Sequence, residues 1–332
     1  MSYRRSQASI LAAISAMAIW MLFPTSVAAQ NGASAKPGTP PRTPDGQPDL
    51  QGIWTNSTLT QLERPADFAS KPVVTEAEAM AYERSTLTQR SRDRRDGGPE
   101  VDVGRAYNEL FFEQGDKLAR IDGKIRTSMI VDPPDGRIPA LTPEAQKKQE
   151  ALRAHAQRHP ADSPRDRSLP ERCLFWPTSG PPMLPGPYNN NYQIVQTPGY
   201  VLIFSEMIHE PRIIPLDGRP HLPPGTRLWL GDSRGHWEGN TLVVETTNFN
   251  GKARFRGSDE NLRVTERFTR VAGDAIVYKF TIDDPTVFTK PWTGELPFLA
   301  TAGPIYEYAC HEGNYALADI LAGARADEKK AK

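Results

Sequence analysis

The sequence predicts a mainly β protein, an antiparallel barrel or sandwich with a helical and irregular N-terminal arm. Three observations lead to this fold class. β-Rich runs separated by turn signals recur through residues 190–310 without helical patterns between them. Helix formers concentrate instead within residues 57–170. Proline contributes 31 of the 332 residues, which disfavours a compact helical bundle because proline breaks helix interiors.

Residues 1–29 are predicted to be a secretory signal peptide. Arg4 and Arg5 precede an apolar run at 10–23, and small residues at 27–29 offer a cleavage site before Gln30. The run is shorter than the about 20 apolar residues of a membrane span, although an uncleaved anchor is the alternative. We therefore expect a periplasmic or secreted protein that has no membrane association after cleavage.

The charge balance and the cysteine content limit the kinds of partner and the compartment that we expect. Lys+Arg and Asp+Glu number 40 each, and loss of residues 1–29 removes two arginines and no acid. A nearly neutral chain favours neither nucleic acid nor an anionic membrane surface, so a small, partly apolar molecule is the expected partner. Cys173 and Cys310 are the only cysteines. In an oxidising compartment their even number predicts a disulfide, with two separate thiols as the alternative. The sequence does not indicate an oligomeric state.

The N-terminal part is predicted to be a flexible leader followed by an arm. Residues 30–48 are rich in Pro, Gly, Ser and Thr, which is typical of a leader. Residues 49–170 begin with a strand at 49–54. Thr75 and Glu78 have capping-box spacing for a helix at 76–88, and Thr142 with Pro143 begins another that ends near 159. A strand at 126–131 lies between the helices.

Residues 171–325 are predicted to form the antiparallel core and a C-terminal helix. The helix is expected at 315–324, with a frayed tail at 326–332. Runs of β-branched and aromatic residues between turn signals predict strands at 192–196, 200–207, 212–216, 241–249, 262–271, 275–282 and 305–310.

Two kinds of motif carry a resemblance. Gly52-Ile53-Trp54 and Gly235-His236-Trp237 resemble the opening of lipocalin-like (calycin) barrels, where the Trp closes the barrel floor, which implies a lipocalin-like fold. Three longer phrases resemble a family of exported bacterial proteins without an assigned activity, so this resemblance implies no catalytic residue. These phrases are YNNNYQIVQTPGYVLIFSEMIHEPRIIPLDGRPH, WLGDSRGHWEGNTLVVETTNF and GPIYEYACHEGNY.

Glu206, His209 and Arg212 are the first candidates for chemistry. Strand alternation places Glu206 at the end of an apolar face formed by residues 200, 202 and 204. Partial desolvation there would raise the carboxyl pKa and suit it to proton transfer. His209 titrates near neutral pH and Arg212 could hold an anionic oxygen. The alternative is a solvated Glu, a surface His and an ion-paired Arg.

Two further acids are candidates. Glu266 interrupts the apolar face of its strand and should point inward, where an ion pair with an arginine is the favoured interpretation. His311 and Glu312 follow an aromatic strand, so His311 could act as a general base that Glu312 orients. The alternative is that this pair caps the tail helix.

The predicted working site is the place where Glu206, His209, His221 and His311 converge. These histidines with a carboxylate could also form a metal site, but no metal-binding spacing supports one and none is predicted. No cofactor is expected, because no glycine-rich phosphate loop follows a strand. The residues expected to bind ligand are Tyr188, Asn190, Asn191, Trp237, Glu266 and Tyr308. The function expected is a cofactor-independent lyase, isomerase or hydrolase, or alternatively a non-catalytic ligand-binding protein.

Overall fold

The computed structural model describes residues 40–330 except 69, 106–108 and 254. The predicted signal peptide and residues 30–39 of the predicted leader lie outside the described residues. In the rest of the leader, Arg42 and Pro48 form an isolated antiparallel bridge.

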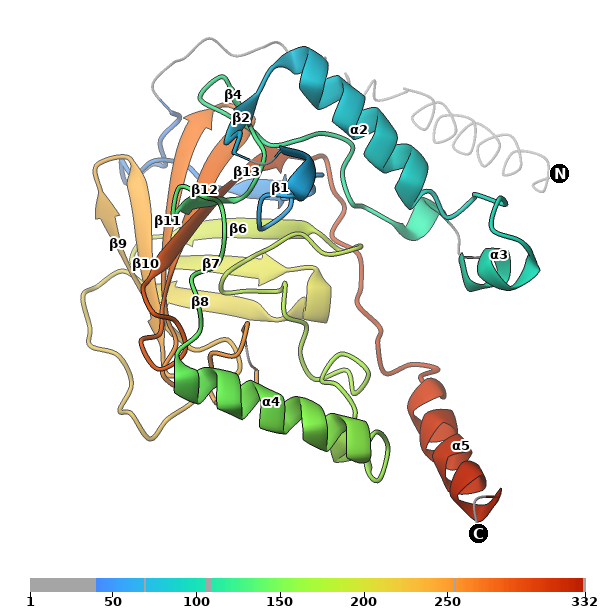
Figure 1. Cartoon of the computed structure of the whole chain (residues 1–332). Coiled ribbons are helices and arrows are strands. Elements are labelled where there is room, and N and C mark those ends of the chain that lie inside the picture. The colour runs from blue at the N-terminus through green and yellow to red at the C-terminus, as the bar shows by residue number, and fades with distance from the viewer. Residues whose placement is uncertain (1–39, 69, 106–108, 254, 331–332) are drawn as a thin grey trace, which may run out of the picture. The chain divides into compact units, whose positions relative to one another are not determined.

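A curled antiparallel sheet forms the core of the described chain (Figure 1). The hydrogen-bonded order of its strands is β8 (Pro211–Pro215), β7 (Tyr200–Ser205), β6 (Asn191–Thr197), β1 (Gly52–Thr55), β13 (Trp292–Ala300), β12 (Ala275–Asp283), β11 (Arg263–Ala272), β10 (Thr241–Thr247) and β9 (Asp232–Glu238). A short strand, β5 (Ile130–Asp132), pairs with β13 off this path. The sheet is nearly closed into a barrel, which confirms the predicted fold class.

Large inward side chains fill the barrel. Alternate residues of β12 are fully buried, as the two-residue period of a strand requires, and this includes Tyr278 and Phe280. Full burial of one such side chain stabilises the fold by about 1.5–3 kcal/mol. The largest side chains with almost no exposure are Trp54, Trp292, Tyr192, Tyr278, Phe268, Phe280, Phe288 and Phe298. The interior is therefore packed with aromatic rings.

Two strands of the sheet were missed, and one predicted strand is absent from the described chain. β9 and β13 were not predicted, because Gly235 interrupts the β-rich pattern of β9, and Gly294 and Pro297 interrupt that of β13. Residues 305–310 were expected to form a strand but have no ladder partner in the described chain. Tyr306 instead donates its backbone N–H to the Glu206 carboxylate, at 2.8 Å.

The arm contains the two predicted helices. α2 (Glu76–Arg90) begins at a reciprocal capping box between Thr75 and Glu78. α4 (Pro143–Arg158) begins after the Thr142 cap. The structure adds a short helix and a small sheet that were not predicted, because strands of two or three residues give too little pattern to recognise. These elements are α3 (Pro99–Arg105), β2 (Val73–Val74), β3 (Arg120–Ile121) and β4 (Lys124–Arg126). The strand predicted at 126–131 is present only at its ends, at residue 126 and in β5.

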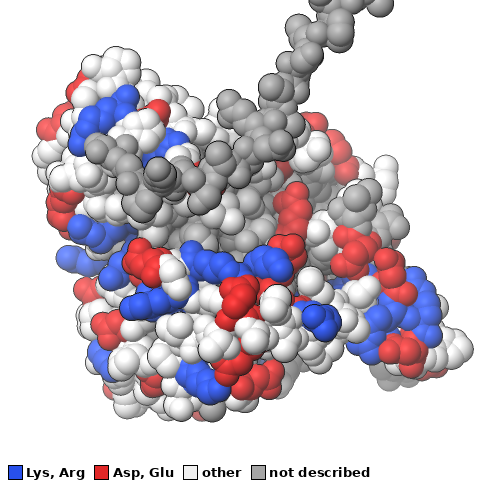
Figure 2. Space-filling model, turned by 90° about the horizontal axis from the view of Figure 1, so that it is seen from above, with Lys and Arg blue, Asp and Glu red and all other residues white. Residues whose placement is uncertain are grey.

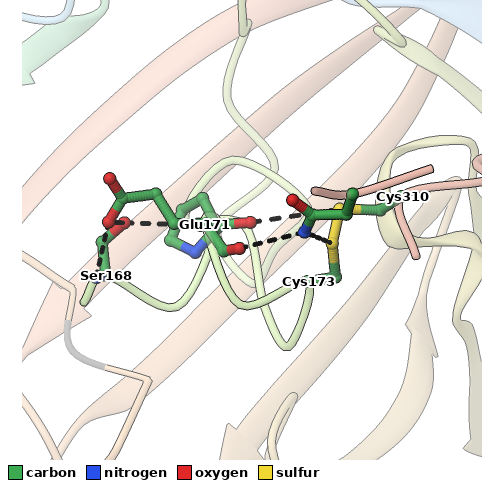
Figure 3. The surroundings of a disulfide bond; sticks show 6 residues. Ser168, Glu171, Cys173 and Cys310 are labelled. Atoms are coloured by element: carbon green, nitrogen blue, oxygen red, sulfur yellow. Dashed lines mark hydrogen bonds between the residues drawn. A yellow bond between two sulfur atoms is a disulfide. The ribbon is translucent and has the colours of Figure 1, made fainter. Parts of the chain in front are cut away.

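The C-terminal segment is fixed by a disulfide and by a helix. Cys173 and Cys310 are bonded, which confirms the predicted pair. Figure 3 shows the bond between Cys173 and Cys310. Beside it, Asn314 donates to the Glu171 carbonyl and to the Cys173 sulfur. α5 (Ala316–Lys330) extends past the predicted helix end, so residues 326–330 are helical and not frayed. Because the bridge spans 137 residues, its entropic stabilisation is about 4–5 kcal/mol.

Candidate functional site

The two end strands of the sheet, β8 and β9, meet at a seam. They lie side by side but are not neighbours in the hydrogen-bonded order. Gly235 of β9 makes the close approach possible. A Cβ at this position would lie 2.7 Å from Leu216 Cδ2 and 2.8 Å from Ile214 Cγ2. At this point the side chains of Ile214 and Leu216 pack against the Gly235 backbone, and β8 and β9 do not pair as neighbouring strands.

A pocket of about 510 Å³ opens at one end of this seam. We call it the seam pocket. Its walls come from the start of β8, the start of β9 and two loops that precede and follow the β9–β10 hairpin. The residues that line it are Glu210, Pro211, Arg212, Ile213, Arg227, Leu228, Trp229, Leu230, Gly231, Asp232, Ser233, Asn250 and Lys252. Edge strands and loops thus supply both charged and apolar groups to one concave site.

Glu210 is a titratable residue of the seam pocket whose pKa is shifted. Partial burial raises the pKa of its carboxyl above the ordinary 4.5. No hydrogen bond or ion pair of this carboxylate is found within the described residues, so nothing offsets the desolvation. An acid with a raised pKa keeps its proton to higher pH and can both donate and accept it.

The backbone before Glu210 is strained. Ile208 has φ +68° and His209 has φ +59°, a left-handed region that β-branched residues rarely adopt. Such strain costs about 1–3 kcal/mol per residue and is concentrated at functional sites. These two residues turn the chain from β7 into β8 and place Glu210 at the pocket. The His209 side chain is exposed and packs edge-on against Phe204, with ring centroids 4.5 Å apart.

A His–Asp pair lies beside the pocket. The Nδ1 atom of His221 is 2.8 Å from Oδ2 of Asp232, a lining residue. The same carboxylate accepts the Leu222 backbone N–H at 2.9 Å and an Arg234 N–H at 2.6 Å. Because an ionised carboxylate only accepts hydrogen bonds, Nδ1 is the ring nitrogen that donates to Asp232 in this pair. His221 itself is not a lining residue.

Arg212 and Glu266 form a buried ion pair inside the barrel. Their closest atoms, Nη2 and Oε2, are 2.7 Å apart, and the Tyr278 hydroxyl donates to Glu266 Oε1 at 2.8 Å. The ion pair predicted for Glu266 is thus found. Beside this carboxylate, burial raises the pKa of Tyr278 well above its ordinary value. The guanidinium nitrogens of Arg212 are buried, so they lie beneath the pocket wall and not on its surface.

Glu206 is buried for a different reason from the one that the alternation predicted. The inward residues of β7 are Val201, Ile203 and Ser205, so the expected face was wrong. The chain leaves the strand at Glu206, whose backbone is helical. Its carboxylate accepts the Tyr306 N–H at 2.8 Å and the Asn191 side-chain amide at 2.9 Å. Glu206 therefore joins the C-terminal segment to β6.

The remaining predicted residues lie in other environments. His311 and Glu312 are exposed, next to the disulfide. Asn190 is buried and its side chain bonds backbone groups of Gly186 and Glu113. Burial raises the pKa of Tyr308, with Tyr188 adding to the effect. Trp237 is half-buried and packs against the barrel core.

The structure brings only some predicted residues together. Arg212 lines the seam pocket, and His221 is bonded to a lining residue. Within the described chain, Glu206 contacts Tyr306 and Asn191, His209 contacts Phe204, and His311 lies beside the disulfide, so the convergence of these residues stays a prediction. Sequence reasoning missed Glu210, Asp232 and Lys252. The signal available for Glu210 was its place between a histidine and Pro211 at the start of a strand.

Charge on the outside is mixed. On the face in Figure 2, basic and acidic side chains of the described residues lie next to one another. Among the residues that the structure covers, no group of three or more His, Cys, Asp or Glu side chains could hold a metal ion. Nor does this part of the chain contain a helix with the length and apolarity to cross a membrane.

Comparison with known proteins adds no assignment: no protein-family model, no curated protein and no solved structure matches the chain.

Proposed function

We propose that this protein is an exported enzyme that binds a small molecule in the seam pocket and moves a proton on it without a cofactor. Glu210 is the general acid or base. The observation that carries the proposal is a pocket-lining carboxyl without a partner in the described chain, whose pKa burial raises. The reaction class is a lyase, isomerase or hydrolase step.

Two further features support this choice. The strained turn at Ile208 and His209 destabilises the fold locally and places Glu210 at the pocket. The Asp232 carboxylate, which lines the same pocket, contacts and orients His221 through Nδ1. A carboxyl in the pocket and an imidazole beside it are the two kinds of group that general acid–base catalysis most often uses. The disulfide fits export to an oxidising compartment, the periplasm or the cell exterior.

A non-catalytic binding protein is the second candidate. The observation that favours it is that Asp232 also receives N–H groups from Leu222 and Arg234, which is what a purely structural carboxylate does. A carrier needs the pocket but no titrating group. The two candidates therefore predict different effects on turnover when the titratable proton of Glu210 is removed by substitution.

The experiment is a turnover screen with wild type and Glu210→Gln. The panel contains activated esters, enolisable ketones and β-hydroxy acids, one class for each reaction type. Wild type is expected to convert one class, and the variant should be at least about 100-fold slower, as for loss of a general acid or base. Glu245→Gln is the control, because Glu245 is an exposed glutamate on the outer face of β10.

Carbon-13 NMR titration of the glutamate carboxyls supplies the second measurement, with Glu210 assigned by its loss in the variant. A Glu210 midpoint at or below 4.5, together with an unchanged rate in Glu210→Gln, would contradict the enzyme proposal. Ligand binding in the pocket without turnover of any class would favour the carrier.

A further inference from the structure

We infer that the seam pocket takes a monoanionic molecule, a carboxylate with an apolar body, and that Lys252 binds its carboxylate. This inference rests on the proposed function and names the substrate class of the same site. It depends on which charges of the pocket are already compensated and on which apolar groups are left exposed.

The cations of the pocket are not equivalent. Arg212 is paired with Glu266 inside the barrel. Arg227 donates to the backbone carbonyls of Phe249 and Glu260, at 3.2 Å and 2.9 Å. Lys252 is exposed, and no hydrogen bond or ion pair of its ammonium group occurs in the described chain. Lys252 is therefore the cation of the pocket that is free for a ligand.

The backbone around Lys252 is fixed. The side-chain oxygen of Asn250, another lining residue, accepts the backbone N–H groups of Lys252 and Ala253, at 2.9 Å and 3.2 Å. Such an Asx turn defines the local chain path. Ala253 is also buried against Phe175 and Leu230. The lysine is thus presented from a packed loop, although its own side chain is exposed.

The acidic residues that line the pocket limit how much negative charge a ligand can carry. Asp232 is compensated by the Arg234 guanidinium and by the Leu222 N–H. Burial raises the pKa of the Glu210 carboxyl, so Glu210 repels a bound anion less than an ordinary glutamate would. One free cation matches one negative charge. A dianion such as a phosphate monoester would bring a second negative charge for which the described part of the pocket offers no further unpaired cation, so a carboxylate is favoured.

An apolar wall completes the site. Ile213 is 59% exposed and Leu228 is 43% exposed, and both line the pocket. Trp229 lies between Leu228 and Leu230 in the sequence and stacks on Phe175, with ring centroids 6.4 Å apart. Large exposed apolar side chains gathered in one concavity mark a binding surface for an apolar group. A ring or a short alkyl chain would remove them from water.

The test measures binding of matched probes. The probes are phenylacetate, its neutral isostere phenylacetamide, and phenyl phosphate. Binding is followed by calorimetry and by the indole N–H signal of Trp229, assigned by its absence in Trp229→Phe. Wild type is expected to bind phenylacetate about tenfold more tightly than phenylacetamide, because the exposed Lys252 ammonium would pair with a negative charge that the amide lacks. Phenyl phosphate should bind more weakly than phenylacetate.

Two variants locate the preference. Lys252→Gln should abolish the preference for phenylacetate and leave phenylacetamide binding unchanged. Lys279→Gln, an exposed lysine on β12, carries the same change of charge and should leave the preference intact. Ile213→Ala should weaken both probes by the same factor, about threefold to tenfold, because it removes apolar contact and no charge.

Equal binding of the acid and the amide would overturn the inference, as would a preference that survives in Lys252→Gln or stronger binding of phenyl phosphate. Failure of all three probes to bind at millimolar concentration would overturn it as well. None of these results touches the Glu210 titration and turnover, which test the proposed function separately.

Discussion

Two carboxylates next to strand β8, Glu266 inside the barrel and Glu210 in the seam pocket, lie in opposite environments. Inside the barrel, Glu266 has no exposed surface but is bonded to Arg212 and Tyr278. In the seam pocket, Glu210 is only partly buried and no partner for it is found in the described chain. The more deeply buried acid is therefore the better compensated one. Compensation fixes an acid in one protonation state, whereas its absence leaves the proton available for chemistry.

The largest expected effect comes from breaking the compensated pair. Arg212→Ala should lower the free energy of unfolding by about 3–5 kcal/mol, because it leaves the Glu266 charge buried without its cation. Urea denaturation, read as a shift of midpoint at constant slope, measures the loss. The double variant Arg212→Met with Glu266→Leu should cost less than either single change, since it removes both charges and keeps the volume. A double variant as unstable as the singles would show that the pair does more than neutralise itself.

Glu206 is a second buried carboxylate with hydrogen-bond partners, and it extends the comparison with Glu210. Glu206→Ala should cost about 2–3 kcal/mol, because the Tyr306 N–H and the Asn191 amide lose their buried acceptor. Native-state hydrogen exchange checks the cause: the Tyr306 amide should lose protection, while amides of β11 and β12 exchange only as fast as the lower global stability requires. Unchanged protection at Tyr306 would rule out the proposed link between β6 and the C-terminal segment. Probe binding in the seam pocket should persist in this variant.

Local chemistry made much of the fold predictable. The capping box at Thr75 and the Thr142-Pro143 start specify helices through neighbours three residues apart, and both helices are present. Glu266 was recognised as inward because its strand alternates cleanly, and its arginine partner followed from the cost of burying a lone charge. Strand β13 was missed because Gly294 and Pro297 are unfavourable in strands by local propensity, and their pairing with β12 is a tertiary contact that the local sequence does not indicate.

The site was less predictable, because the seam is a long-range feature. No local pattern states that the ends of the sheet are β8 and β9, so nothing indicated that Glu210 and Lys252 line one pocket. Arg212 was chosen as a candidate because of its charge. The face of β8 on which it lies depends on the pairing register with β7, and in the observed register its side chain points into the barrel, to Glu266. The φ values at Ile208 and His209 were equally invisible, since neither residue type favours that conformation.

The smallest effect tests the acid of the pocket through the pH dependence of stability. Burial raises the folded-state pKa of Glu210 above 4.5, its ordinary value in the unfolded chain. Below pH 4.5 both states hold the proton, so Glu210→Gln should change stability little. As pH rises from 4.5 through the raised folded pKa, the unfolded state releases the proton more readily, and Glu210 progressively destabilises the folded protein. Glu210→Gln should therefore become more stable than wild type across this window.

The gain should reach only about 0.5 kcal/mol, because the carboxyl is partly solvated and water screens most of the effect. The measurement is the difference in urea midpoint between wild type and variant at several pH values between 4 and about 7, at constant ionic strength. Glu245→Gln, on the exposed face of β10, serves as the control for a general change of charge. A difference that is flat with pH, or that favours wild type as pH rises, would mean that the folded protein compensates Glu210 as it does Glu266, and the acid–base role would lose its physical basis.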